Sequence, residues 1–213
     1  MDSSIKEMYE KHHLNNRPRG TVIFEKERSQ FLIGKIGKNK KVLDVGCRDG
    51  SLTKYFLKDN DVLGLDIDSQ ALDYAKNNFN MKVEETDLNG EWNLLANKFD
   101  VVVCAEILEH LYYPNNVLKK IKEVLTSEGV LLGTIPNAFS FKNRIRLLCA
   151  KKKNTPLNDP THINHFSWKE LEGILSNHFL DVKLYPGGRF AKFDKFLPGW
   201  FSFFIMFEAK NKK

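Results

Sequence analysis

The chain has 213 residues, of which 42% are apolar and 28% are charged, and its formal net charge is +6. This composition is ordinary for a globular protein with one α/β domain, and the length allows a substantial core. The positive charge is compatible with an acidic acceptor or an anionic surface, but it is too small to indicate nucleic-acid binding.

Cysteine usage and the absence of targeting signals indicate a cytoplasmic protein. The three cysteines are widely separated and form no C-x-x-C pair, which is typical of a reducing compartment. The first residues are polar and carry no apolar segment of a signal peptide. The longest aromatic and aliphatic run, 200–207, is far shorter than the roughly 20 residues of a membrane-spanning helix.

Two helices are predicted before the first strand. The first covers 4–13 and begins with a capping box, and the break at 15–20 contains proline and glycine. The second helix covers about 22–36, and Gly37 is expected to end it.

Residues 41–51 are predicted to form a strand, a glycine turn and the start of a helix. Apolar residues run through Asp44 into Gly46 and Gly50, and Ser51 is the expected N-cap of the helix that follows. Backbone can approach a ligand closely at the glycines, and free N–H groups of the first helical turn point into the gap. The turn is therefore a candidate nucleotide site, with a ligand-free tight turn as the alternative.

The same turn excludes two common nucleotide motifs. A G-x-G-x-x-G dinucleotide motif starting at Gly46 would need glycines where Arg48 and Ser51 stand. Gly50 is not followed by the Lys-Ser or Lys-Thr of a phosphate-binding P-loop.

The second strand, 62–67, ends in Asp66, twenty positions after the first glycine of the turn. A carboxylate at this tip of a doubly wound sheet can accept hydrogen bonds from both hydroxyls of a ribose. The alternative for Asp66 is a loop or helix-capping carboxylate. Asp68 or Ser69 is expected to cap the next helix, 70–77.

The next elements alternate as they do in a parallel sheet. Strands are predicted at 82–88 and 99–106, and the second of these is nearly all apolar, as a central parallel strand should be. A helix is expected at about 115–126, followed by a turn at 127–129 and a fifth strand at 130–135.

The pattern loosens after residue 136. Residues 137–166 are an insertion with a basic amphipathic helix, and Ser167 begins another helix with a capping box. Two closing strands, 180–185 and 203–209, are expected as an antiparallel pair at the sheet edge. The amphipathic character of the insertion helix comes from apolar residues set against basic ones. The apolar residues are Ile145, Leu147 and Leu148, and the basic residues are Lys142, Arg144 and Arg146.

The run V-L-D-V-G-C-R-D-G at 42–50 resembles the first motif of class I S-adenosylmethionine-dependent methyltransferases, which is hydrophobic-hydrophobic-D/E-x-G-C-G-x-G. It departs from that motif at Arg48, where the family has its middle glycine. The resemblance covers about 38–136 and implies an α/β, Rossmann-like, doubly wound seven-stranded fold with one antiparallel edge strand. A single methyltransferase domain over 1–213 would then have four parts: an N-terminal helical lid (1–37), a cofactor-binding core (38–136), a substrate-cap insertion (137–166), and a closing helix with edge strands (167–213).

The resemblance implies S-adenosylmethionine as cofactor and S-adenosylhomocysteine as product. It implies that Asp87 accepts a hydrogen bond from the adenine amino group and that Leu88 lies against adenine. Tyr9 and Arg17 could reach the cofactor carboxylate from the lid, with surface packing as the alternative for both. The expected cofactor-binding residues are Asp44, Gly46, Cys47, Gly50, Asp66, Ile67, Asp87, Leu88, Cys104 and Glu106.

Methyl transfer to a hydroxyl requires an aligned acceptor and a group that takes its proton. His110, at the tip of the fourth strand, and His162 are the candidate catalytic bases, and a hydrogen-bonded packing role is the alternative for each. The stretch around His162 resembles the H-x-x-x-F-S/T segment of bacterial methyltransferases that act on sugars, quinones and other small acceptors. For His165 a packing role is expected.

Glu106, Glu109 and His110 form an E-x-x-E-H motif. Together with His162 they resemble the metal set of small-RNA 3′-terminal 2′-O-methyltransferases, although the motif also occurs in quinone-biosynthesis O-methyltransferases. A bound divalent metal, Mg²⁺ or Mn²⁺ by ligand type, is therefore an open alternative.

The predicted function is O-methylation of a small-molecule or glycan-type acceptor, and nucleic acid is not the expected partner. The first alternative is a metal-dependent RNA 2′-O-methyltransferase. The second is a non-catalytic cofactor-binding or interaction module that kept the fold. The departure from the motif at Arg48 is the reason for considering it.

The basic insertion has three interpretations. The default is a solvated helix that caps the site. The alternatives are a phosphate-recognising element for a nucleotide-linked or lipid-linked acceptor, and a transient contact with an anionic membrane surface. The last alternative rests on aromatic and aliphatic residues that accompany the basic ones, although packing over the acceptor pocket is the expected role for them: Phe193, Phe196, Leu197 and Trp200.

Overall fold

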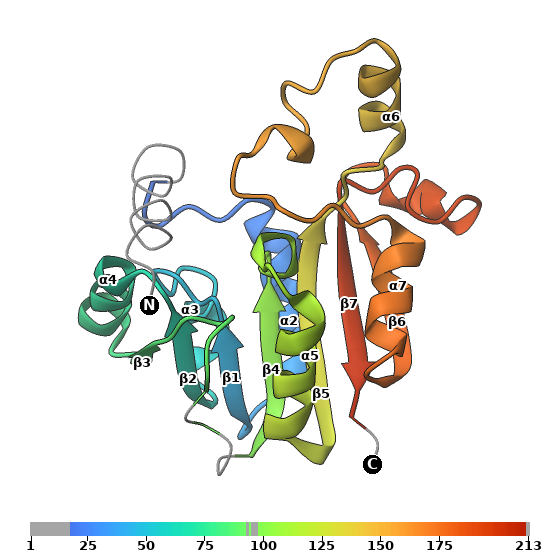
Figure 1. Ribbon diagram of the computed structural model, residues 1–213. Helices are drawn as coiled ribbons and strands as arrows, with labels where there is room; N and C mark the ends of the chain where they lie inside the picture. Colours follow the sequence, from blue (N-terminus) through green and yellow to red (C-terminus); the bar gives the residue numbers. More distant parts are fainter. Residues whose placement is uncertain (1–17, 93, 95–97, 212–213) are drawn as a thin grey trace.

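The computed structural model describes residues 18–92, 94 and 98–211, and they form a seven-stranded sheet in the order β3-β2-β1-β4-β5-β7-β6 (Figure 1). The strands from β1 to β5 are mutually parallel, while β7 runs antiparallel to both β5 and β6. This confirms the doubly wound fold and the antiparallel closing pair; the reversed strand lies one place in from the edge. The strands are β1 Lys41–Val45, β2 Asp61–Asp66, β3 Lys82–Glu85, β4 Phe99–Ala105, β5 Leu125–Pro136, β6 Leu180–Gly187 and β7 Phe204–Lys210.

Helices cover both faces of the sheet, because the central strands are apolar on both sides. Leu43, Val102 and Cys104 face one core with α5 and α7, which lie on the near face in Figure 1. Val42 and Val103 face a second core with α2, α3 and α4. The α-helices are α2 Glu25–Ile36, α3 Lys54–Leu57, α4 Ser69–Phe79, α5 Pro114–Val124, α6 Phe141–Leu148 and α7 Trp168–Ser176, and the 3₁₀ helices are η1 Leu108–His110, η2 Pro156–Asn158 and η3 Ala191–Lys195.

Helix ends follow the predicted capping chemistry in three places. Gly37 ends α2 with a φ of +73°, and the Asp68 carboxylate accepts the Ala71 N–H at the start of α4 at 3.0 Å. Ser167 and Glu170 make the expected capping box of α7. The helix expected at 4–13, with Tyr9, and the neighbouring Arg17 lie outside the described residues.

Two local predictions are wrong. Ser51 does not cap a helix: its N–H donates to Asp49 Oδ1 at 3.1 Å in a turn, and α3 is a single turn that starts only at Lys54. Residues 127–129 are not a separate turn, because β5 starts at Leu125 and continues through them.

The β4–β5 register explains the second difference. The register shifts between Phe99 and Val101, so that β5 bulges over 126–129. The Asn211 side chain donates to the Thr126 carbonyl at 2.9 Å, and the Asn211 N–H donates to the Gly129 carbonyl at 2.8 Å. Asn211 thus satisfies carbonyl groups in the bulge.

The carboxyl ends of the parallel strands meet at one edge of the sheet, the upper edge in Figure 1, and α6 projects beyond that edge. Across the described residues, every helix is too short or too polar to cross a bilayer.

Gly133 in β5 tests how tightly the sheet is packed. A Cβ at this position would overlap the Cys104 carbonyl oxygen and the Phe207 ring, both fully buried. We expect Gly133→Ala to lower the free energy of unfolding by about 1–3 kcal/mol. At Gly173, in α7, a Cβ would meet nothing within 4 Å. Gly173→Ala should therefore raise that free energy by up to about 1 kcal/mol, and urea unfolding of both variants would show opposite shifts.

Candidate active site

A solvent-accessible cavity opens at the carboxyl ends of β1, β2 and β4, where a doubly wound sheet places its ligands. Gly50, Cys104 and His162 do not line it; Cys104 lies fully buried in the core below. The other predicted site residues line it together: Asp44, Gly46, Cys47, Asp66, Ile67, Asp87, Leu88, Glu106 and His110.

The loop after β1 is shaped by left-handed backbone at alternate positions, with φ of +76° at Gly46, +51° at Arg48 and +72° at Gly50. Left-handed backbone costs a non-glycine residue roughly 1–2 kcal/mol. Arg48 nevertheless adopts this left-handed conformation, which a glycine, as in the family's motif, would adopt without strain. The departure from the motif therefore leaves the loop open to the cavity rather than closing it.

Asp66 holds this loop against the tip of β2. Its Oδ2 accepts the Arg48 N–H at 2.8 Å and its Oδ1 accepts the Asp68 N–H at 2.9 Å. Since a carboxylate offers about four acceptor positions, Asp66 can hold the loop and also accept ligand hydroxyls. The loop-carboxylate role and the ligand role that the sequence left as alternatives are thus compatible.

Asp44 supplies a buried acid at the floor of the cavity. The Thr53 hydroxyl donates to its Oδ2 at 2.6 Å, and its side chain is almost inaccessible to water. Burial raises the pKa of Asp44 to about 7; the Thr53 hydrogen bond opposes the rise, nearby Asp66 adds to it, and Arg28 opposes it. An ammonium or sulfonium group beside Asp44 would favour its ionised form.

Arg28 and Lys120 are site residues that the sequence did not reveal. Arg28 lines the cavity, is buried, and donates to the Ile23 carbonyl at 3.2 Å, which fixes the segment entering α2. Lys120, on α5, donates to the carbonyl groups of Leu88 and Gly90 and so holds the loop that follows β3. Neither residue belongs to a sequence motif, and each comes to the site only through its contacts in the folded chain.

The loop that follows β3 forms the part of the cavity where the sequence predicts the adenine. Asp87 lines the cavity and its Oδ1 accepts the Asn89 N–H at 2.9 Å. Leu88 is half-buried against the core, and the Trp92 ring N–H donates to its carbonyl at 3.1 Å. A carboxylate next to an aliphatic wall can accept from an amino group and pack against a planar base.

His110 lines the opposite part of the cavity, and its environment sets its tautomer. Its Nδ1 lies 2.9 Å from the Thr161 carbonyl oxygen, which can only accept, so Nδ1 carries the proton and Nε2 is the basic nitrogen. His162 is arranged alike, with Nδ1 3.0 Å from the Pro156 carbonyl oxygen. The two rings meet edge to face at 4.8 Å between centroids.

Backbone contacts bring the insertion to this point. The N–H groups of Ile163 and Asn164 both donate to the Glu109 carbonyl, at 2.8 and 2.9 Å. The Asn164 side chain adds a bond of 2.6 Å to the Leu111 carbonyl. His162 therefore reaches His110 although 51 residues separate them in the sequence.

Three of the four residues of the predicted metal set come together. Glu109, His110 and His162 each offer a ligand atom, and these atoms lie within 4.8 Å of one another, so two imidazoles and a carboxylate could hold a divalent ion. Glu106 is not in this group; its Oε1 accepts from the Thr134 hydroxyl at 3.1 Å at the cavity wall. The four-residue set is therefore not assembled here.

Comparison with known proteins gives a consistent result. A family model described as a methyltransferase domain matches residues 13–182. Ubiquinone biosynthesis O-methyltransferase from Actinobacillus pleuropneumoniae is 32% identical over 129 residues, 56% of this chain and 52% of the relative. The same enzyme from Haemophilus ducreyi is 34% identical over 134 residues, 58% and 54% of the two chains. The chain thus spans about half the length of these curated relatives.

Solved structures share the fold at low sequence identity. A SAM-dependent methyltransferase from Thermotoga maritima superposes with a TM-score of 0.68 at 16% identity, covering 97% of this chain and 95% of its own. An N-methyltransferase from Bradyrhizobium japonicum, in complex with S-adenosyl-L-homocysteine, gives 0.67 at 16% identity, with 98% of each chain covered.

The raised pKa of Asp44 makes a prediction about stability. An aspartate in the unfolded chain has a pKa of about 3.9, so the folded state holds this proton more tightly. The stabilising contribution is complete below about pH 4 and is lost as pH rises to about 7. Relative to wild type, Asp44→Asn should gain on the order of a few kcal/mol in unfolding free energy across this range. If urea unfolding shows the same change of unfolding free energy with pH for wild type and Asp44→Asn, this prediction is contradicted.

Proposed function

Because the chain belongs to the methyltransferase domain family, we propose that it transfers a methyl group from S-adenosylmethionine to an oxygen of a small-molecule or glycan-type acceptor. The observation that carries the proposal is the cavity in which Asp44, Asp66 and Asp87 stand at the tips of successive strands around an open loop. The O-methyltransferase names of the curated relatives support oxygen as the methylated atom.

The chain's acidic residues have separate roles in holding the cofactor. Asp66 accepts the ribose hydroxyls while its loop contacts keep it in place. Asp87 accepts the adenine amino group, and Leu88 packs against the base. Asp44, whose pKa lies near neutrality, favours a cationic group at the inner end. When bound, the cofactor supplies an electrophilic methyl group on a sulfonium.

His110 is the proposed general base. Its Nδ1–H is held by the Thr161 carbonyl, so Nε2 is free of a proton in the neutral ring and can take one from an acceptor hydroxyl. Glu109, whose Oε1 lies 3.9 Å from that Nε2, favours the imidazolium that results. His162 does not line the cavity; it packs against His110 and keeps the ring in position.

The clustering of Glu109, His110 and His162 favours a second candidate, a metal-dependent O-methyltransferase, with an RNA 2′-hydroxyl among the acceptors to be tried. A divalent ion on these residues would acidify the acceptor hydroxyl directly. Activity that is lost with a chelator and restored by Mg²⁺ or Mn²⁺ would distinguish this candidate from the general base.

A non-catalytic module is the least supported alternative. This alternative was considered because Arg48 replaces a motif glycine, but the loop that carries Arg48 still lines an open cavity. For localisation we propose the cytoplasm, because the described cysteines, Cys47, Cys104 and Cys149, are all free thiols.

Cofactor binding is the first test. We expect calorimetric titration with S-adenosylmethionine to give saturable binding that Asp66→Ala weakens at least about tenfold, since hydrogen bonds to a charged group are lost. Asp59→Ala, at an exposed site with a salt bridge to Lys38, is the control and should bind like wild type. Thermal unfolding checks that each variant is folded. Absence of binding to the folded wild type would contradict the proposal.

The base assignment needs a substitution that keeps the backbone contact. In His110→Asn the side-chain amide can still donate to the Thr161 carbonyl, but the basic Nε2 is gone. We expect kcat to fall about 10²–10⁴-fold, with unchanged cofactor affinity and loss of the limb of the pH–rate profile that the base produces. Radiolabelled methyl transfer to phenols, catechols and sugars measures this, with His178→Asn at the α7 end as control.

If the His110→Asn variant keeps its full rate on an acceptor that wild type methylates, His110 is not the base. Cofactor binding without transfer to any hydroxyl compound would contradict oxygen as the methylated atom.

A further inference from the structure

We propose that α6, the three lysines 151–153 directly after it, and the segment 189–197 form one amphipathic surface that binds an anionic lipid bilayer. This lipid-facing surface consists of exposed apolar side chains with basic residues between them. Its apolar members are Phe141, Ile145 and Leu148 on α6, and Phe190, Phe193, Phe196 and Leu197 on the second segment. The proposal does not depend on which acceptor is methylated.

Helix α6 exposes its apolar face and buries part of its polar face, the reverse of a helix that packs on a protein core. Phe141, Ile145 and Leu148 share one face by their i, i+4, i+7 spacing, and their exposed fractions are 49%, 45% and 82%. Asn143, about 200° around the helix from Phe141, is the buried residue, and its side chain donates to the Asn137 carbonyl at 2.9 Å. The polar side holds the helix to the protein, and the apolar stripe faces outward.

The segment 189–197 repeats this arrangement. Phe193, Phe196 and Leu197 are exposed by 41%, 70% and 48%. Each exposed aromatic ring has a basic neighbour within reach: Lys192 lies 5.2 Å from the Phe193 centroid, and Lys195 lies 4.7 Å from that of Phe196. Rings flanked by cations are the composition expected at a bilayer interface.

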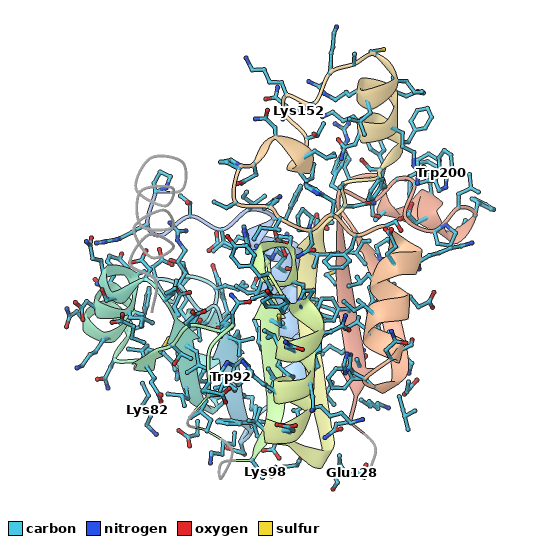
Figure 2. All side chains as sticks on the ribbon, in the orientation of Figure 1. Lys82, Trp92, Lys98, Glu128, Lys152 and Trp200 are labelled. Atoms are coloured by element: carbon cyan, nitrogen blue, oxygen red, sulfur yellow. The ribbon has the colours of Figure 1, made fainter. Side chains whose placement is uncertain are left out.

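Contacts with Trp200 fix the position of α6 relative to the chain that follows the segment 189–197. The Phe141 N–H donates to the Trp200 carbonyl at 2.6 Å, and the Arg144 guanidinium lies 4.8 Å from the Trp200 ring centroid. Figure 2 shows Trp200 beside α6, with Lys152 at the same end of the molecule. The surface is therefore formed before any partner arrives, which limits the ordering cost of binding.

Charge complementarity selects the partner. The stretch 137–158 contains six basic and no acidic residues. The only acid of 189–197, Asp194, is buried and accepts the N–H groups of Gly199 and Ser202 at 3.2 Å each, so it does not offset the exposed cations. The surface basic residues are Lys142, Arg144, Arg146, Lys151, Lys152, Lys153, Arg189, Lys192 and Lys195.

The aliphatic residues decide between lipid and nucleic acid. Leu148, at 82% exposure, and Ile145 cannot stack on bases, and a polyanion in water would leave them hydrated. A bilayer interface offers both an apolar phase for the stripe and anionic headgroups for the lysines. The observations therefore favour an anionic bilayer over RNA.

The surface lies at the same sheet edge as the cavity. Helix α6 follows the carboxyl end of β5, and the insertion that carries it also supplies His162. A bilayer seated on this surface would therefore meet the protein on the acceptor side, not at the amino ends of the strands.

Vesicle flotation tests the proposal with the full chain. We expect binding to vesicles of phosphatidylglycerol mixed with phosphatidylcholine at least about tenfold tighter than to phosphatidylcholine alone, and weaker as salt is raised. The triple variant Lys151→Gln/Lys152→Gln/Lys153→Gln should lose at least about tenfold. Its control, Lys38→Gln/Lys82→Gln/Lys98→Gln, removes the same charge at the amino ends of the strands (Lys82 and Lys98 in Figure 2) and should change binding less than about twofold.

A second pair of variants tests the apolar stripe. Leu148→Ser/Phe196→Ser should weaken binding at least about tenfold, whereas Ile33→Ser/Leu180→Ser, exposed apolar residues elsewhere, should not. Thermal unfolding confirms that all variants are folded. The proposal is overturned if wild type binds neutral and anionic vesicles equally or not at all, if the controls weaken binding as much as the test variants, or if the protein binds polyuridylate but no vesicles.

Discussion

The Asp66 carboxylate joins the parts on which the candidate site depends. It accepts the Arg48 N–H from the loop after β1 and the Asp68 N–H at the start of α4, while its own carbonyl accepts the Thr86 N–H after β3. Three segments around the cavity are thus tied to one residue at a strand tip. Hydrogen bonds to a charged group are among the stronger ones, so the contact can also hold Arg48 in its costly backbone conformation.

Much of the fold was predictable because its signals are local. The apolar strands β1 and β4, the Asp68 cap and the Ser167 capping box are each encoded within a few residues. The β5 bulge was not, since it is set by pairing with β4 and by the distant Asn211. The late start of α3 was also missed, although its cause is local: Asp49 accepts the N–H of Ser51, two residues further on, and α3 begins only at Lys54.

The candidate site divides in the same way. Asp44, Asp66 and Asp87 follow predicted strands, so topology alone brings them together. Arg28 and Lys120 sit on helices without a motif and become site residues only through tertiary contacts. The α6 stripe has the spacing of a core-facing helix, and only the structure, with the stripe exposed and Asn143 buried, reveals that the apolar side faces outward.

The attachment of the insertion to the core has a consequence for divergence. Ile163 and Asn164 bind the Glu109 carbonyl through their backbone N–H groups, and such bonds do not depend on which side chains stand there. An insertion of different composition can dock at the same carbonyl without disturbing the loop that Asp66 holds. The acceptor range and the membrane affinity proposed above can then change by exchange of one segment, while the cavity formed by the strands beneath it is retained.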